Sequence, residues 1–359
     1  MDFFSMALTV AGLVFFETIC SIDNAIINAE VLGTMSARAR RWFLFWGLLA
    51  AVFLIRGLLP WMIVWAVNPG MGPVGALTST FSNDPGVIAS IKESAPLLLL
   101  GGGVFLILLF FHWLFLEPKK FGLPSEPFFY RNGVWFYAVA SIFLAAIVWF
   151  ALQQQPMMAF SAVVGSTAFF ITHGFKENAE QTEKELLTST KSDLSKILYL
   201  EVIDATFSID GVLGAFAFTL SVPLILIGNG IGAFVVRQFT VGNIQNVKKY
   251  VYLKNGAMYS ILFLGMIMVM DSFHFETPAW VSPIITFGII GFFFMKSHKE
   301  NQKNPFTTAI GKICASSRSQ FYSQGFFPAA VWVHGHTNQD PTYRWQKSSP
   351  QTRRRPHLK

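Results

Sequence analysis

Two apolar segments of the sequence carry the same order of acidic and hydroxyl side chains. Both read acid-x-x-x-Ser-Ile-Asp: Glu17, Ser21 and Asp23 followed by Asn24 in the first, and Asp204, Ser208 and Asp210 followed by Gly211 in the second. Carboxylate, hydroxyl and amide oxygens are the ligands of hard divalent cations such as Mg²⁺, Ca²⁺ and Mn²⁺. The two segments therefore predict a cation site built from both.

A second pattern follows each acidic segment. Gly47 and Arg56 are nine residues apart, as are Gly228 and Arg237, and both pairs lie in apolar runs. We expect the two arginines to pair with the acids or to gate access to them. Asn229 lies between Gly228 and another glycine, and its side-chain carbonyl is a further candidate ligand.

The composition places these acids in a membrane. Of 359 residues, 53% are hydrophobic, 16% aromatic and only 13% charged, whereas soluble domains average about 25% charged residues. Two cysteines exclude a disulfide framework and a thiolate metal cage. Disordered proteins and ordinary cytosolic enzymes are excluded as well, and the chain is predicted to be an all-α, polytopic membrane helical bundle.

The apolar runs predict about nine transmembrane helices, because a span needs about 20 such residues. They are approximately 8–30, 42–66, 96–116, 133–152, 157–173, 197–219, 222–242, 256–270 and 279–295. Lysine and arginine occur in alternate connections in a pattern that places the N-terminus outside and the C-terminus in the cytoplasm. Omitting the eighth span, the shortest of the nine, would break this alternation.

The acidic segments lie in the first and sixth spans and therefore cross the bilayer in opposite directions. Inverted repeats of this kind build many secondary transporters, with the substrate site where the repeats meet. We expect a transporter domain at 1–300, with one repeat at about 8–116 and the other at about 197–295. An acid inside a span costs about 2.5–3.5 kcal/mol, which favours a functional role for the repeated acids.

Helical geometry raises a difficulty for a single ion. At 100° per residue, Glu17 and Asp23 lie about 120° apart on a straight helix. A local break near Ser-Ile-Asp-Asn, and another near Ser-Ile-Asp-Gly, would let both acids face one site and would free backbone carbonyls. The sequence therefore predicts two broken helices.

The ligands favour Mn²⁺, Ca²⁺ or Mg²⁺ as a transported substrate, with no permanently bound cofactor. Protons compete with a cation for carboxylates, so protons are an available coupling ion. His112 and His173 lie near the ends of the third and fifth spans, where we expect packed or interfacial histidines. The expected partners are the transported ion and the lipid bilayer, and an enzymatic activity is not expected.

These residues resemble the TerC family of integral membrane proteins. The likeness covers the Glu17–Asn24 segment, the run from Arg41 to Arg56, and the second acidic helix with the segment from Val222 to Arg237. It implies a bacterial inner-membrane transporter, associated in that family with manganese export and tellurite resistance. By position it makes Asp23, Asn24, Asp210 and Asn229 the metal ligands, supported by Glu17 and Asp204. Gly211 and the long connections depart from the family pattern and indicate a divergent subgroup.

Three other functions fit parts of the sequence. A transporter of another cationic solute would also use intramembrane acids, and a non-transporting scaffold of a stress-resistance complex remains an alternative. An intramembrane aspartyl protease also needs two aspartates, but it would show Tyr-Asp and Gly-x-Gly-Asp in place of two Ser-Ile-Asp segments. The oligomeric state is left open.

The net charge of +7 comes from the end of the chain. Residues 301–359 hold nine lysines and arginines against Asp340, and no apolar run. We expect a disordered cytoplasmic tail that contacts anionic lipid. The basic balance therefore does not indicate a nucleic-acid partner.

Overall fold

The computed structural model describes residues 3–47, 49–50, 56–78, 85–188, 192–242 and 249–303, and the account below is limited to them. The chain divides into two units, Met1–Pro305 and Phe306–Lys359. Of the predicted tail, only residues 301–303 are among those described, so the prediction of disorder lies outside the described residues.

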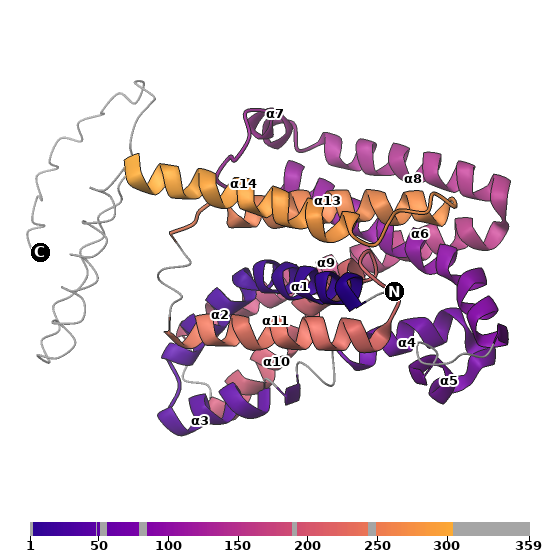
Figure 1. Cartoon of the computed structure of the whole chain (residues 1–359). Coiled ribbons are helices and arrows are strands. Elements are labelled where there is room, and N and C mark those ends of the chain that lie inside the picture. The colour runs from indigo at the N-terminus through magenta and orange to yellow at the C-terminus, as the bar shows by residue number, and fades with distance from the viewer. Residues whose placement is uncertain are drawn as a thin grey trace, which may run out of the picture. The chain divides into compact units, whose positions relative to one another are not determined.

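Every regular element in the described ranges is a helix (Figure 1). The α-helices are α1 (Phe3–Cys20), α2 (Ile22–Gly33), α3 (Ala37–Trp42), α4 (Leu58–Val67), α5 (Gly72–Thr78), α6 (Pro85–Phe115), α7 (Glu126–Arg131), α8 (Trp135–Gln154), α9 (Pro156–Thr188), α10 (Asp193–Ala215), α11 (Val222–Gly242), α13 (Leu253–Ser272) and α14 (Val281–Lys303). A π-helical turn, η1 (Phe43–Gly47), and a 3-10 turn, η3 (Pro69–Met71), complete them.

Six of the described helices are long and apolar enough to cross a membrane. They are α1 and the apolar parts of α6, α8, α9, α13 and α14, at Phe3–Cys20, Glu93–Phe115, Trp135–Gln154, Pro156–Lys176, Leu253–Ser272 and Val281–Gln302. These helices confirm an all-helical membrane protein with several spans. The short eighth predicted span, 256–270, is among them and lies within α13.

The other three predicted spans fall on helices that are shorter or more polar. α4 and the apolar part of α11, Val222–Gln238, are shorter apolar helices, and residues 48 and 51–55 of the predicted span 42–66 lie outside the described residues. α10 is long enough, but Glu201, Asp204 and Asp210 lower its mean hydropathy. Nine crossings therefore remain a prediction.

Glycines bring the central helices into close contact. α6 packs against α9 and α13, and 78% of its apolar part is buried, against 17% for α8. A Cβ atom on Gly165 would overlap the carbonyl group of Gly101, and one on Gly103 would lie 2.9 Å from the carbonyl oxygen of Gly265. Small residues of this kind let membrane helices approach backbone to backbone, so α6 is the centre of the bundle and α8 lies at its edge.

The helices that carry the two acidic segments, α1 with α2 and α10, lie beside each other at the candidate site. α1 packs along α11 and also contacts α10, while α10 contacts α2, α4 and η1 (Figure 1). The predicted break occurs in the first acidic segment, because α1 ends at Cys20, Ser21 is a turn residue and α2 begins at Ile22. The prediction is wrong for the second segment: α10 runs unbroken through Asp210 and Gly211 to Ala215. Helical hydrogen bonding tolerates glycine near a helix end, so Gly211 does not interrupt it.

Candidate functional site

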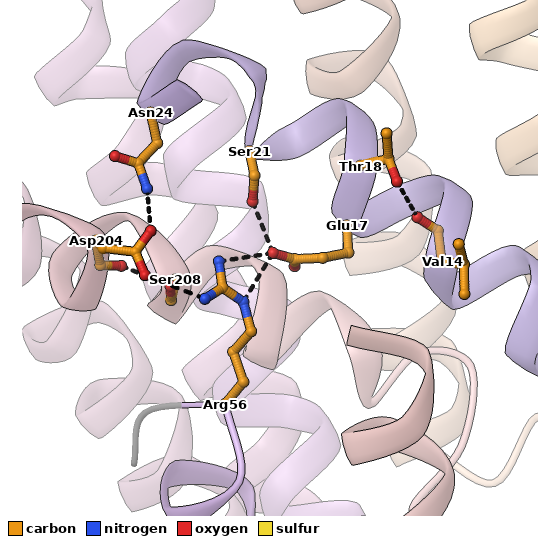
Figure 2. Close-up of polar contacts among 8 residues, drawn as sticks. All are labelled: Val14, Glu17, Thr18, Ser21, Asn24, Arg56, Asp204 and Ser208. Atoms are coloured by element: carbon orange, nitrogen blue, oxygen red, sulfur yellow. Dashed lines mark hydrogen bonds and ion pairs between the residues drawn. The ribbon is translucent and has the colours of Figure 1, made fainter. Parts of the chain in front are cut away.

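A single arginine joins the first acids of the two repeated segments. The Nε and Nη2 atoms of Arg56 lie 2.9 and 2.8 Å from Glu17 Oε1, and its Nη1 lies 3.2 Å from Asp204 Oδ2 (Figure 2). All three residues are buried, with 1% of Glu17, 2% of Arg56 and 5% of Asp204 exposed. With both acids ionised, this triad carries a formal charge of −1 in the interior.

Amide and hydroxyl groups extend the triad. Asn24 Nδ2 donates a hydrogen bond to Asp204 Oδ1, and Ser21 Oγ donates to Glu17 Oε1 at 2.7 Å (Figure 2). Ser21 is four residues after Glu17, and its backbone N–H still donates to the Glu17 carbonyl at 3.0 Å, so the two side chains share one face at the end of α1. Ser208, the repeat counterpart of Ser21, donates instead to the backbone carbonyl of Asp204, at 2.5 Å.

The first acidic segment and α10 lie antiparallel along most of their length. A Cβ atom on Gly211 would overlap Glu17 Oε2, and further along the pair Asn24 bonds to Asp204. At the far end, Ser36 Oγ donates to Asp193 Oδ2 at 2.5 Å. Along this series of contacts, residue numbers rise from Glu17 to Ser36 on one side while they fall from Gly211 to Asp193 on the other. The two acidic segments therefore run in opposite directions.

Arg237, the counterpart of Arg56, has a different environment. Its Nη2 donates to the Phe43 carbonyl at 2.5 Å, and its guanidinium carbon lies 4.3 Å from the centre of the Phe43 ring. A Cβ atom on Gly47 would overlap Glu201 Oε1 and lie 2.8 Å from Arg237 Nη2. The bare Cα of Gly47 thus leaves room where Arg237 and Glu201 converge.

Asn229 and Asp23, two of the predicted ligands, form no described hydrogen bond with the triad. Asn229 on α11 is fully buried, and neither its Oδ1 nor its Nδ2 has a hydrogen-bond partner. The Oδ1 atom of Asn24 is also buried and unpartnered. Asp23 belongs to α2, but its side chain lies outside the described residues.

Asp210 has a different charged partner from Glu17 and Asp204. Its Oδ2 forms an ion pair with Lys176 of α9, and both side chains line a cavity. His112 and His173 line the same cavity, with ring centres 3.6 Å apart. The sequence pattern does not link these groups, apart from the spacing of His173 and Lys176, which are three residues apart and so share a helix face.

Among the described residues, no three histidine, cysteine, aspartate or glutamate side chains are grouped closely enough to hold a metal ion. In the triad, the Arg56 guanidinium occupies the space between the two carboxylates (Figure 2). A cation can take that place only if the guanidinium withdraws.

The fold and this buried polar centre define a multi-pass, all-helical membrane protein. The family described as "Protein of unknown function (DUF475)" matches residues 22–304, and the chain belongs to that family. The chain is also similar to the "Uncharacterized membrane protein YceF" of Bacillus subtilis (strain 168), with 32% identity over 89 residues. That match covers 25% of this chain and 35% of the relative, so the chain spans about a third of the relative's length. No solved structure shows significant similarity.

Proposed function

We propose that this protein is a transporter of a hard divalent cation, with Mn²⁺ the favoured substrate. The observation that carries the proposal is the bridging of Glu17 and Asp204 by Arg56 in the interior. Buried carboxylates need a compensating cation. In this arrangement the guanidinium supplies that cation when no metal is bound.

The oxygen atoms around the triad suit a hard cation. When Arg56 withdraws, Glu17 and Asp204 offer carboxylate oxygens, and Asn24 offers an Oδ1 that has no partner in the Arg56-bound arrangement. Asn229 adds a buried amide on the neighbouring helix α11. Oxygen ligands favour Mg²⁺, Ca²⁺ and Mn²⁺ over softer metals, and the likeness to the TerC family favours Mn²⁺ among them.

Inverted repeats are part of the proposal, and two contacts support them. Under the offset of 187 residues, Glu17 corresponds to Asp204 and Asn24 corresponds to Gly211. The contact of Glu17 with Gly211 is therefore the counterpart of the contact of Asn24 with Asp204. A two-fold axis in the membrane plane relates such pairs, and transporters of this type move a substrate by rocking one repeat against the other.

The remaining expectations belong to the same proposal. The lysine and arginine distribution places the N-terminus outside and the C-terminus in the cytoplasm of a bacterial inner membrane. The direction is export, protons are the candidate coupling ion, and the protein is not an enzyme.

One observation favours a second candidate, a transporter of an organic cation. The group that occupies the acidic centre is a guanidinium, so a solute with a guanidinium or ammonium group would meet the same carboxylates. A non-transporting scaffold would use the triad only to hold helices together.

The deciding experiment is flux into liposomes containing the purified protein. Mn²⁺ entry is followed with a trapped, manganese-quenched fluorophore, for the wild type, Glu17→Gln and Asp204→Asn. We expect flux in the wild type and a loss of at least about tenfold in both variants, corresponding to about 1.4 kcal/mol or more of lost stabilisation.

The matched control is Glu276→Gln, which removes an exposed acid from the connection between α13 and α14 and should leave the flux unchanged. Wild-type liposomes no more permeable than protein-free ones, or folded Glu17→Gln and Asp204→Asn variants with normal flux, would overturn the proposal. Competition by arginine but not by Mg²⁺ would favour the organic cation.

A further inference from the structure

A cavity of about 530 Å³ lies beside the turn between α1 and α2. Cys20 and Ile22, the two neighbours of Ser21, line it on that side. Residues of α1, α2, α6, α9, α10 and α13 and of the connection that follows α6 line the rest. The cavity therefore begins one residue away from the hydroxyl that bonds to Glu17.

Much of the wall is apolar, and several charged or histidine side chains interrupt it. Ile19, Ile26, Leu109, Met258 and Ile261 supply aliphatic surface. These aliphatic side chains offer a cation no ligands, so along this part of the wall an entering ion must keep its water shell.

The cavity is large enough for a hydrated divalent ion. Six water molecules at roughly 30 Å³ each occupy about 180 Å³, about a third of the cavity volume. The water shell needs hydrogen-bond acceptors, and the imidazoles of His112 and His173 and the carboxylate of Asp210 are on the wall.

The two carboxylate oxygens of Asp210 have different environments. Its Oδ2 is paired with Lys176, while its Oδ1 is buried without a hydrogen-bond partner. The side chains of Asp210 and Lys176 are 14% and 12% exposed, respectively, so little bulk water reaches the pair. A tethered ammonium thus occupies the acid that a cation in this cavity would approach.

We propose that this cavity is a vestibule that binds a hydrated divalent cation at Asp210, and that Lys176 is the displaceable counterion of that site. The inference rests on the proposed function, to which it adds an entry site distinct from the Glu17–Asp204 centre. Lys254 and Glu117, paired with each other and about a third or more exposed, lie on the more open part of the wall. Lys176 excludes weakly attracted ions, because an entering cation must compete with the ammonium for the carboxylate.

The native cysteine Cys20 allows a test that does not depend on transport. The full chain with Cys314→Ser, in lipid nanodiscs, is treated with a small cationic methanethiosulfonate reagent, and the rate of Cys20 modification is measured against Mn²⁺ and, separately, Mg²⁺. We expect Mn²⁺ to slow the modification in a saturable way and Asp210→Asn to abolish this protection. Lys176→Gln should lower the half-protecting concentration by about tenfold, because the competing ammonium is gone.

Lys254→Gln is the matched control, since it removes a positive charge from the same wall but unpairs Glu117 and not Asp210. Lys176→Arg keeps the ion pair and should retain protection near the wild-type concentration, which covers the case in which Lys176→Gln does not fold. An unreactive Cys20, or protection that survives Asp210→Asn, would overturn the inference. Normal Mn²⁺ flux without protection of Cys20 would contradict only the vestibule. Protection of Cys20 without Mn²⁺ flux in the wild type would contradict the transport proposal and leave the vestibule supported.

Discussion

Glu17 and Asp204 are 187 residues apart in the sequence, yet both bond to the guanidinium of Arg56. They are the first acids of the two repeated segments, and they meet across a pair of antiparallel helices. Two negative charges share one positive charge in the interior, so the centre is stable only while a cation is present. Arg56 is that cation in this structure.

Replacement of Arg56 provides the most direct test of this relationship. Arg56→Gln should destabilise the protein by about 3–5 kcal/mol, because it leaves two buried carboxylates without their partner. Thermal unfolding in detergent measures the loss. Millimolar Mn²⁺ should restore part of the stability in this variant, since a cation can then occupy the vacated place. Arg237→Gln should show much weaker rescue, because the Arg237 guanidinium meets backbone carbonyls, the Phe43 ring and the single acid Glu201, and does not bridge two carboxylates.

Gly211 should be intolerant of even one methyl group. A Cβ atom there would overlap Glu17 Oε2, so Gly211→Ala must push the carboxylate away from Arg56. We expect a loss of about 1–3 kcal/mol and reduced Mn²⁺ flux. Gly291→Ala, on α14 with no atom within 4 Å of the added carbon, is the control. Equal behaviour of the two variants would contradict the placement of Glu17 against α10.

Replacement of Asn229 distinguishes a structural role of its side chain from a role as a cation ligand. Its amide is fully buried and unpartnered, so Asn229→Leu should raise thermal stability by about 1–2 kcal/mol while lowering Mn²⁺ flux. Asn255 provides the comparison, because its amide donates to the Lys120 carbonyl and to Glu126, and Asn255→Leu should destabilise. A less stable Asn229→Leu variant with normal flux would count against a ligand role.

Gly165 should control the crossing of α6 and α9. Its Cα faces the carbonyl of Gly101, with no space for a side chain. Gly165→Ala should therefore separate the helices and sharply reduce the yield of monodisperse protein in size-exclusion chromatography. Gly174 lies in the same helix with nothing within 4 Å of an added Cβ, so Gly174→Ala should leave the yield unchanged.

Glu126 should be a purely structural acid. Its carboxylate accepts hydrogen bonds from the backbone nitrogens of Gly122 and Leu123, at 2.7 and 3.1 Å, and from Asn255 and Tyr259. Glu126→Gln weakens these bonds and should cost about 1–3 kcal/mol in thermal unfolding, with the flux per folded molecule unchanged. A specific loss of flux would place Glu126 in the transport path.

Much of the candidate site could be predicted from residue types at fixed offsets. The repeated acids, the hydroxyls and Arg56 were all visible, because ionisable side chains in apolar runs are rare. The prediction failed where it needed helix geometry: the break forms at Ser21 and not in α10. The sequence also could not show that Asp210 pairs with Lys176 while Glu17 and Asp204 pair with Arg56, since all three acids occur in similar sequence contexts.

The sequence by itself determined the class of the protein, the position of most membrane helices and the presence of acids within them. These follow from local hydropathy, which depends only on neighbouring residues. Only the tertiary structure decided which polar side chains meet: Arg56 with Glu17 and Asp204, Lys176 with Asp210, and His112 with His173. Those partners lie on helices distant in sequence, and their pairing depends on how the helices rotate and pack, which no single segment encodes.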